Sequence, residues 1–263
     1  MSFKNSFDIA CLESEALQRL FHEMTSYVQN IRIEMVANAR GHRGREEHPA
    51  TTIGLTYQIP TVQFIDSLDR GQRIEAIAHE LTHLLLVYRY RLGVVGRRIP
   101  RPGNSEEIFK FCMSMNREWD YMLGQIINTA HHLILIDYLE EEHGIESSLH
   151  LQLLHRHFCR LAREDEREKE PLFAKGLIAF EYEKLIGGID SVTGLNCQAE
   201  FFWHAYHLAQ RHFGSYGLRS VPTPSSYEED ILSFLEDLGY LRMDFVFFPE
   251  GERDFSLKIS KTL

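Results

Sequence analysis

The most constraining feature of this chain is a short apolar stretch at residues 76–87, AIAHELTHLLLV. It contains the pattern H-E-x-x-H at His79, Glu80 and His83. On a helix the two histidines lie one turn apart on the same face, which is the separation that two imidazoles need to bind one Zn²⁺. Glu80 then lies beside the metal, where a carboxylate can take a proton from a zinc-bound water and pass it to a leaving amine. The stretch therefore predicts a zinc-binding helix that carries a general base for amide hydrolysis.

The residues around this short pattern decide how much weight it carries. Because the chain has 14 histidines, a chance match is a real alternative, and the two residues would then be a pair of buried structural histidines. A buried active-site helix requires uncharged neighbours. Six neighbours of the pattern are uncharged: Ala76, Ile77, Leu81, Thr82, Leu84 and Leu85. These neighbours favour the zinc site.

With these flanks the stretch resembles the signature of the zincin metallopeptidases. Upstream, residues 51–57 (TTIGLTY) and 61–65 (TVQFI) have the composition of two short strands. This order is similar to the small cytosolic ImmA/IrrE-type proteases and other minimal gluzincins, in which an edge strand runs beside the active-site helix. The resemblance covers about residues 50–140 and implies a zinc-dependent peptidase. If the sheet edge is open beside the zinc, a peptide can add to it as a strand.

Zinc needs a third protein ligand and an open fourth position. The downstream candidates are Glu106, Glu107, Glu118, Asp120, His131, His132 and Asp137. We favour His132, because Asn128 and His132 share one helical face in the apolar segment IINTAHHLILIDYL, where an unpaired imidazole would be costly. The segment also resembles the Asn-x-Ala-x-Asp segment of some minimal zincins, whose last residue is the third ligand. Here a histidine occupies that place, which departs from the family pattern.

Two other residues remain open as the third ligand. Glu118 is the first alternative, because a gluzincin uses a glutamate from the next helix. His131 is the second, pointing about 100° around the helix from His132. A side-chain donor near the metal would stabilise an oxyanion, and Tyr121 or His131 could serve in that role, with no spacing that chooses between them.

A second histidine-rich segment, QAEFFWHAYHLAQRH at residues 198–212, needs its own interpretation. Glu200, His204 and His207 fall on one helical face and could bind a second metal. The aromatic residues between them indicate a core helix whose polar face is simply exposed to water, and this interpretation is favoured.

Net charge and the distribution of basic residues indicate which classes of partner this chain can bind. The net charge of −10 disfavours a nucleic-acid-binding surface, and no basic stripe interleaved with aromatics is present. The one basic cluster either holds an acidic substrate or, as we favour, forms a solvated loop: Arg89, Arg91, Arg97, Arg98 and Arg101.

The sequence also predicts where the protein resides. No apolar run approaches 18 residues, and the N-terminus MSFKNSFDIA lacks the features of a signal peptide. The four cysteines are far apart without a C-x-x-C pair, which indicates reduced core residues rather than a disulfide framework: Cys11, Cys112, Cys159 and Cys197. We expect a soluble cytoplasmic protein.

Apolar periodicity predicts the remaining elements. In the first half we expect an amphipathic helix at 13–39, the active-site helix at 71–91, and a helix from 105 to 142 in which Gly124 marks a break or a close helix approach. In the second half we expect helices at 147–169, 171–186 and 198–212, a short helix that ends at Gly239, and a hairpin of strands 241–248 and 254–259.

The predicted fold is α+β, mainly α, with a zincin-like core of a small sheet plus the active-site helix. Residues 1–145 would form the metal-binding catalytic domain and residues 146–263 a helical C-terminal region that ends in the hairpin. The predicted function is a zinc metallopeptidase that cleaves a peptide or protein amide bond, with His79, His83 and His132 as ligands and Glu80 as the base. The substrate class rests on the resemblance, since a motif does not determine a substrate.

Two alternatives remain. One is a regulatory or binding protein that keeps the zincin fold without turnover. It would bind zinc and be indifferent to Glu80→Gln, whereas a peptidase would lose nearly all activity. The other is a histidine-rich metalloprotein with a second metal site at Glu200, His204 and His207, for which more than one metal per chain is expected.

Overall fold

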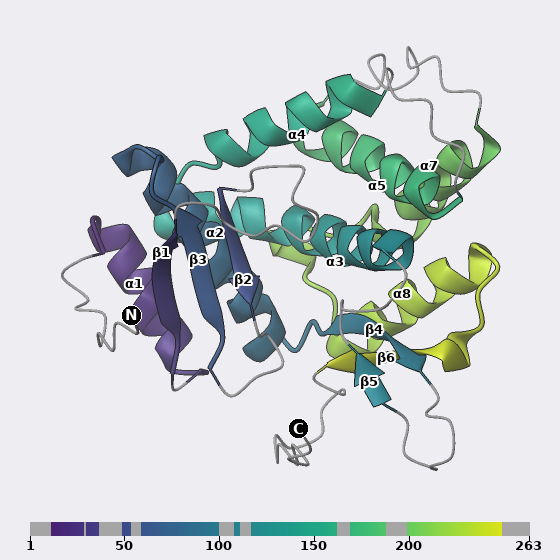
Figure 1. The fold of residues 1–263 in the computed structure, drawn as a ribbon, viewed down its shortest axis with the longest axis horizontal. Coiled ribbons are helices and arrows are strands. Elements are labelled where there is room, and N and C mark those ends of the chain that lie inside the picture. Colours follow the sequence, from purple (N-terminus) through teal and green to yellow (C-terminus); the bar gives the residue numbers. More distant parts are fainter. Residues whose placement is uncertain are drawn as a thin grey trace.

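The fold was analysed in a computed structural model of the chain (Figure 1). The structure describes residues 12–28, 30–36, 49–53, 59–99, 108–110, 117–161, 169–187 and 199–248. This part of the chain is mainly helical and carries two small sheets, which confirms the predicted α+β, mainly α class.

The helices and strands are bounded as follows. The α-helices are α1 (Glu15–Thr25), α2 (Arg70–Tyr88), α3 (Arg117–Tyr138), α4 (Ser148–Leu161), α5 (Lys169–Ile186), α7 (Glu200–Phe213) and α8 (Pro224–Asp237). The strands are β1 (Arg32–Val36), β2 (Ala50–Ile53), β3 (Thr61–Ile65), β4 (Val94–Ile99), β5 (Ile108–Lys110) and β6 (Phe245–Phe248).

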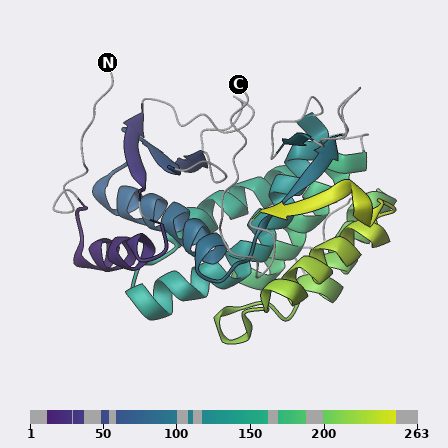
Figure 2. The same ribbon diagram turned by 90° about the horizontal axis from the view of Figure 1, so that it is seen from below.

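The first sheet has the strand order β1-β3-β2 and packs against α2. β1 runs parallel to β3, and β2 runs antiparallel to β3, with Ile33 and Thr52 both opposite Val62. Val62 and Phe64 are buried in the core. Figure 2 shows this sheet on one side of α2, with α1 on the other side. The strand expected at 61–65 is therefore present, and the one expected at 51–57 is β2 as far as Ile53, beyond which residues 54–58 lie outside the described part.

The predicted helix at 13–39 is wrong after Thr25. α1 ends there, and residues 32–36 form β1 instead. The strand is favoured because its backbone groups pair with neighbours that are distant in sequence: the Arg32 amide donates to the Pro60 carbonyl at 3.0 Å, and β1 continues along β3. This pairing also buries Ile33. The local apolar spacing contains no information about that partner strand.

The helix α2 closely matches its expected range of 71–91. Asp69 caps its N-terminus and forms a reciprocal capping box with Gln72. The helix ends at Tyr88, and Arg91 then takes a left-handed backbone conformation with φ 59°, which turns the chain toward β4. The six uncharged neighbours of the H-E-x-x-H pattern are all buried, as a core helix requires.

The second sheet is antiparallel with the order β5-β4-β6, and it joins distant parts of the chain. Val95 of β4 lies opposite Phe247 of β6. The helix expected from residue 105 is wrong at 108–110, which form β5, and α3 begins only at Arg117. The first strand of the expected C-terminal hairpin is present as β6, which pairs with β4. The second strand expected at 254–259 lies outside the described residues, so the hairpin itself stays a prediction.

α3 runs unbroken through Gly124, where an added Cβ would meet nothing within 4 Å. The expected break or close approach at Gly124 is therefore wrong. The close approach lies at Gly176 of α5, where a Cβ would lie only 2.4 Å from the Phe202 carbonyl oxygen of α7. Glycine is required there because the two helix backbones nearly touch.

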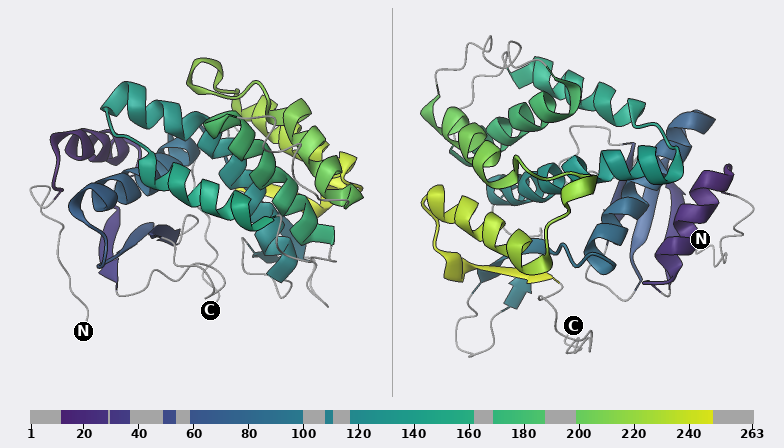
Figure 3. Two further views of the ribbon diagram at one scale, coloured as in Figure 1. Left: turned by 90° about the horizontal axis from the view of Figure 1, so that it is seen from above. Right: turned by 180° about the vertical axis from the view of Figure 1, so that it is seen from behind.

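The helices of the second half agree with the sequence apart from their ends. α4, α5, α7 and α8 all form where periodicity predicts them, and Gly187 and Gly239 follow α5 and α8 with positive φ. α5 packs between α3 and α7, and Figure 3 shows this arrangement from two further sides. One hydrophobic core includes buried residues from both predicted regions, 1–145 and 146–263.

Two further expectations concern the surface. None of the helices in the described part is long and apolar enough to cross a membrane. Cys159, expected in the core, is exposed on α4, which corrects that prediction. The other three cysteines lie outside the described residues.

Candidate metal centre

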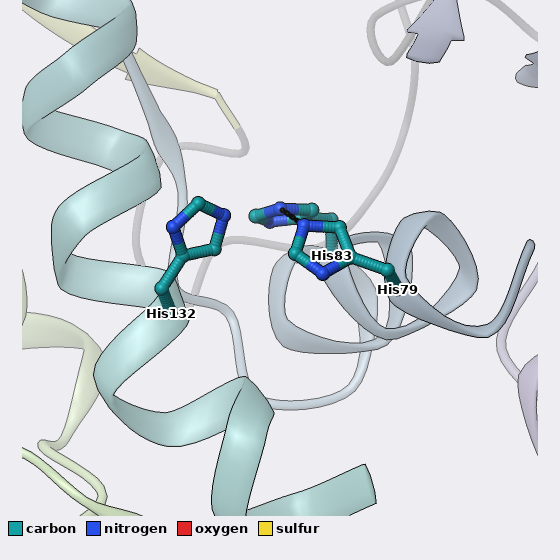
Figure 4. Close-up of side chains that lie close together, drawn as sticks. All are labelled: His79, His83 and His132. Atoms are coloured by element: carbon teal, nitrogen blue, oxygen red, sulfur yellow. Dashed lines mark hydrogen bonds between the residues drawn. The ribbon is translucent and has the colours of Figure 1, made fainter. Parts of the chain in front are cut away.

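Three histidines from the helices α2 and α3 come together (Figure 4). His79 and His83 lie one turn apart on α2, and their Nε2 atoms are 3.1 Å apart. His132 faces them from α3, with its ring centroid 4.9 Å from that of His79 and 5.2 Å from that of His83. The ring nitrogens that these residues offer all lie within 4.8 Å of one another, so the group could hold a metal ion.

These distances fit a tetrahedral site. Two nitrogens bound at 2.0–2.1 Å in a tetrahedron are about 3.3 Å apart, close to the separation of the His79 and His83 nitrogens. Among the described residues no fourth histidine, cysteine, aspartate or glutamate joins this group. The group would thus supply three protein ligands, and within the described residues it would leave one vertex of a tetrahedron for water or substrate, as expected of a catalytic rather than a structural site.

Glu181 of α5 holds the far side of His132. Its Oε1 accepts a hydrogen bond from His132 Nδ1 at 2.7 Å, and its Oε2 accepts from Thr129 Oγ1 at 2.9 Å and from Gln125 at 3.3 Å. Because a carboxylate accepts here, His132 carries its proton on Nδ1 and has its lone pair on Nε2. This is the carboxylate–histidine arrangement that orients metal ligands. Periodicity within one helix cannot identify Glu181, because the contact joins residues 49 positions apart.

His131, the neighbour of His132 on α3, points elsewhere. Its Nδ1 lies 3.1 Å from His83 Nδ1, and its Nε2 lies 3.2 Å from the Leu92 carbonyl oxygen. Both ring nitrogens are therefore engaged away from the open vertex. The suggestions that His131 is the third ligand or the oxyanion donor do not fit this geometry.

His150, at the start of α4, completes the cluster. Its ring stacks on His79 with centroids 4.9 Å apart, and its Nε2 lies 3.4 Å from Glu181 Oε1. The carboxylate of Glu75 on α2 accepts hydrogen bonds from the backbone amides of Leu149 at 2.8 Å and His150 at 2.7 Å, which caps α4 and sets its position. His132, His150 and Glu181 form a second group whose ligand atoms lie within 4.8 Å of one another.

Glu80 is anchored to the first sheet. Thr52 Oγ1 of β2 donates a hydrogen bond of 2.6 Å to Glu80 Oε2. The threonine hydroxyl thereby holds one carboxylate oxygen, and the Thr52 backbone also bonds to the carboxylate. Burial raises the pKa of Glu80 to about 7, and the bonds from Thr52 limit this rise. Such a pKa suits a group that exchanges protons near neutral pH.

Burial also controls the charge of the histidines. It lowers the pKa of His79, His83 and His132, with further lowering by neighbouring histidines, and it lowers the pKa of His131 to about 3. Burial alone would raise the pKa of Glu181, but its interactions with His132 and His150 outweigh this and hold the pKa well below its ordinary value. At neutral pH His79, His83 and His132 are therefore neutral imidazoles beside the ionised Glu181, which is the protonation state that metal binding needs.

Of the remaining candidates from the sequence, three lie far from His132 along α3, one has another partner, and two lie outside the described residues. Glu118 and Asp120 lie on α3 at least twelve residues before His132, or about 18 Å or more along the helix at 1.5 Å per residue. Tyr121 is similarly displaced, by about 16 Å. Asp137 is directed to the Leu218 amide at 3.5 Å. Glu106 and Glu107 lie outside the described residues.

The second predicted cluster on α7 does not assemble. His204 Nε2 bonds the Asp237 carbonyl at 3.0 Å, His207 Nδ1 lies 3.3 Å from Gln210, and Glu200 is exposed. In the described part of the chain, these three residues belong to no group that could hold a metal. They lie on the solvent-exposed face of α7, whose other face is buried and includes Phe202 and Tyr206.

The structure describes part of the basic cluster that follows α2. Arg89 pairs with Glu23 and lies 3.3 Å from the Tyr138 hydroxyl, so it serves to hold α1 and α3 near the end of α2. The solvated loop expected at Arg97 and Arg98 is wrong, because the backbones of both residues belong to β4 and pair with neighbouring strands. Their side chains and all of Arg101 lie outside the described part.

Comparisons with protein-family models, with curated proteins and with solved structures found no match to this chain.

Proposed function

We propose that this protein is a zinc-dependent peptidase with a zincin-like core. The observation that carries the proposal is the convergence of His79, His83 and His132 around an open vertex, with Glu80 next to them in the chain. A structural histidine pair needs neither a third converging imidazole nor a carboxylate of raised pKa.

Zinc is the metal that best fits the donors. Three neutral imidazoles in a compact, near-tetrahedral arrangement suit Zn²⁺, whereas Mg²⁺ and Ca²⁺ prefer oxygen ligands and octahedral or larger shells. Glu181 supports the assignment, because it directs the lone pair of His132 Nε2 toward the other two histidines. When bound, zinc would polarise a substrate carbonyl and lower the pKa of a coordinated water.

The protein groups then perform the proton transfers. Glu80, held through Oε2 by Thr52, takes a proton from the attacking water and delivers it to the leaving amine. The raised pKa of Glu80 makes both steps accessible near neutral pH, because the carboxyl can accept and release a proton there.

The position of the first sheet supports a peptide substrate. β2 pairs with β3 on one side, and within the described residues no strand pairs with its other side. The same strand holds Glu80 through Thr52, so its edge lies beside the reacting groups. An extended peptide that added to β2 would run past the metal vertex.

Metal content is the decisive measurement. Protein purified without a histidine tag should contain one zinc per chain by elemental analysis, and His83→Ala and His132→Ala should each lose it. Glu118→Ala is the matched control and should keep it, because Glu118 lies about 21 Å from His132 along α3. No stoichiometric metal after zinc addition would overturn the proposal, and two metals per chain would instead favour a second ion at His132, His150 and Glu181.

Activity separates a peptidase from a non-catalytic metal protein. The zinc-loaded chain should cleave unstructured protein substrates, and Glu80→Gln should keep its zinc and lose cleavage by two orders of magnitude or more. If both forms bind zinc and neither cleaves any member of a broad peptide library, the binding-protein alternative holds.

A further inference from the structure

A chain of hydrogen bonds runs from the end of α2 through His131 to His83. The Leu92 carbonyl oxygen lies 3.2 Å from His131 Nε2, and His131 Nδ1 lies 3.1 Å from His83 Nδ1. His131 is 1% exposed, so water does not compete for these positions.

The direction of this chain follows from chemistry. A carbonyl oxygen can only accept, so His131 must carry a proton on Nε2. A neutral imidazole has one N–H, and therefore His131 Nδ1 is an acceptor. His83 Nδ1 must then be the donor, which leaves the lone pair of His83 on Nε2.

We propose that His131 is a positioning residue that holds His83 in the tautomer protonated on Nδ1, with Nε2 ready to bind the metal. This inference rests on the proposed metal site for its purpose but not for its geometry. His83 Nε2, which carries the lone pair, lies 3.1 Å from His79 Nε2 within the three-histidine group. The opposite tautomer would place a proton on the atom that must bind the metal.

Two consecutive residues of α3 thus have different roles at the proposed metal site. His132 enters the metal group itself and is fixed by Glu181, whereas His131 lies about 100° around the helix and fixes His83. The two orienting groups differ in charge. Glu181 is an ionised carboxylate, and His131 is a neutral acceptor, which avoids the cost of a second buried charge beside the same cluster.

The turn after α2 makes this possible. Arg91 adopts φ 59°, and the next residue, Leu92, is fully buried, with its amide bonded to the Leu86 carbonyl at 3.0 Å. Its own carbonyl oxygen is the acceptor for His131. The hydrogen-bond chain therefore begins at a backbone carbonyl of a residue whose own amide is also hydrogen-bonded.

The test reads the tautomer directly in the metal-free protein. Long-range ¹H–¹⁵N correlation spectra of chelator-treated, ¹⁵N-histidine-labelled protein distinguish protonation on Nδ1 from protonation on Nε2, and the His83 signals are identified by their loss in His83→Gln. We expect His83 to be protonated on Nδ1 in the wild type. Protonation on Nε2 overturns the inference without any variant.

Two substitutions at one position supply the matched control. His131→Asn places an amide oxygen near the position of Nδ1 and should preserve both the His83 tautomer and the zinc Kd within about threefold. His131→Leu removes the acceptor, so the His83 signal should shift toward Nε2 protonation and the zinc Kd should rise about 10- to 100-fold. An unchanged tautomer in His131→Leu contradicts the proposal. Because the spectra need no metal, a failed peptidase assay and a failed tautomer assignment are distinguishable.

Discussion

Thr52 and Glu80 are joined by a hydrogen bond of 2.6 Å between the threonine Oγ1 and the glutamate Oε2. This bond connects the edge strand β2 to the helix α2 and fixes one oxygen of the proposed general base. The carboxylate is thereby oriented by a strand whose other edge pairs with no strand in the described part of the chain.

Replacing Thr52 with valine should impair catalysis without removing the metal. A hydrogen bond to a charged group contributes about 1.5–3 kcal/mol, so kcat should fall about 10- to 100-fold while bound zinc stays constant. The acid limb of the pH–rate profile should also move to higher pH, because the bond from Thr52 lowers the pKa of Glu80. Thr52→Ser keeps the hydroxyl and should remain close to wild type; equal losses in both variants would show that the methyl group matters instead.

Removing the partner of His132 should weaken metal binding more than it weakens the fold. Glu181→Ala leaves the protonated Nδ1 of His132 and the Thr129 hydroxyl without their acceptor, and the zinc Kd should rise about 10- to 100-fold. Glu181→Gln retains an acceptor oxygen and should lose less. Competition with a chelating dye measures both affinities. A larger loss in the glutamine variant than in the alanine variant would exclude the orienting role.

The metal-free protein should lose stability as the pH falls below 6.5. His131 is neutral when folded because burial lowers its pKa from 6.5 to about 3, so between these values the unfolded chain binds a proton that the folded chain does not. Each such group lowers the free energy of unfolding by at most about 1.4 kcal/mol per pH unit. Urea unfolding in chelator from pH 4 to 8 should show a slope that is smaller by about one proton in His131→Asn. Parallel curves for the two proteins would contradict the assignment.

Two glycine positions should respond to alanine in opposite directions. In Gly176→Ala the new Cβ would lie 2.4 Å from the Phe202 carbonyl oxygen, so α5 and α7 must separate, at a cost of about 1–3 kcal/mol. In Gly124→Ala the Cβ meets nothing within 4 Å, and the gain in helix propensity should stabilise the fold by up to about 1 kcal/mol. Urea denaturation of the two variants checks both signs. A stable Gly176→Ala protein would mean that the two helices do not approach this closely.

Elements whose residues interact locally could be predicted well from the sequence. The capped helix at 70–88, the strand at 61–65 and the helices of the second half depend on periodicity, caps and glycine stops, which act within one element. The sequence does not predict β1, β4 or β5, because each is a short strand that forms only beside a partner elsewhere in the chain.

The same division applies to the candidate metal centre. The chain by itself determines that His79, Glu80 and His83 share one helix and that the two histidines face the same way, since helical geometry is local. The sequence also shows that His132 lies in an apolar segment. Only the tertiary structure decides that His132 lies across from them, that Glu181 bonds to His132 and Thr52 to Glu80, and that His131 lies against His83. These contacts join residues 28 to 49 positions apart, and they arise from the packing of α2, α3, α5 and β2 around one core rather than from any repeat along the chain.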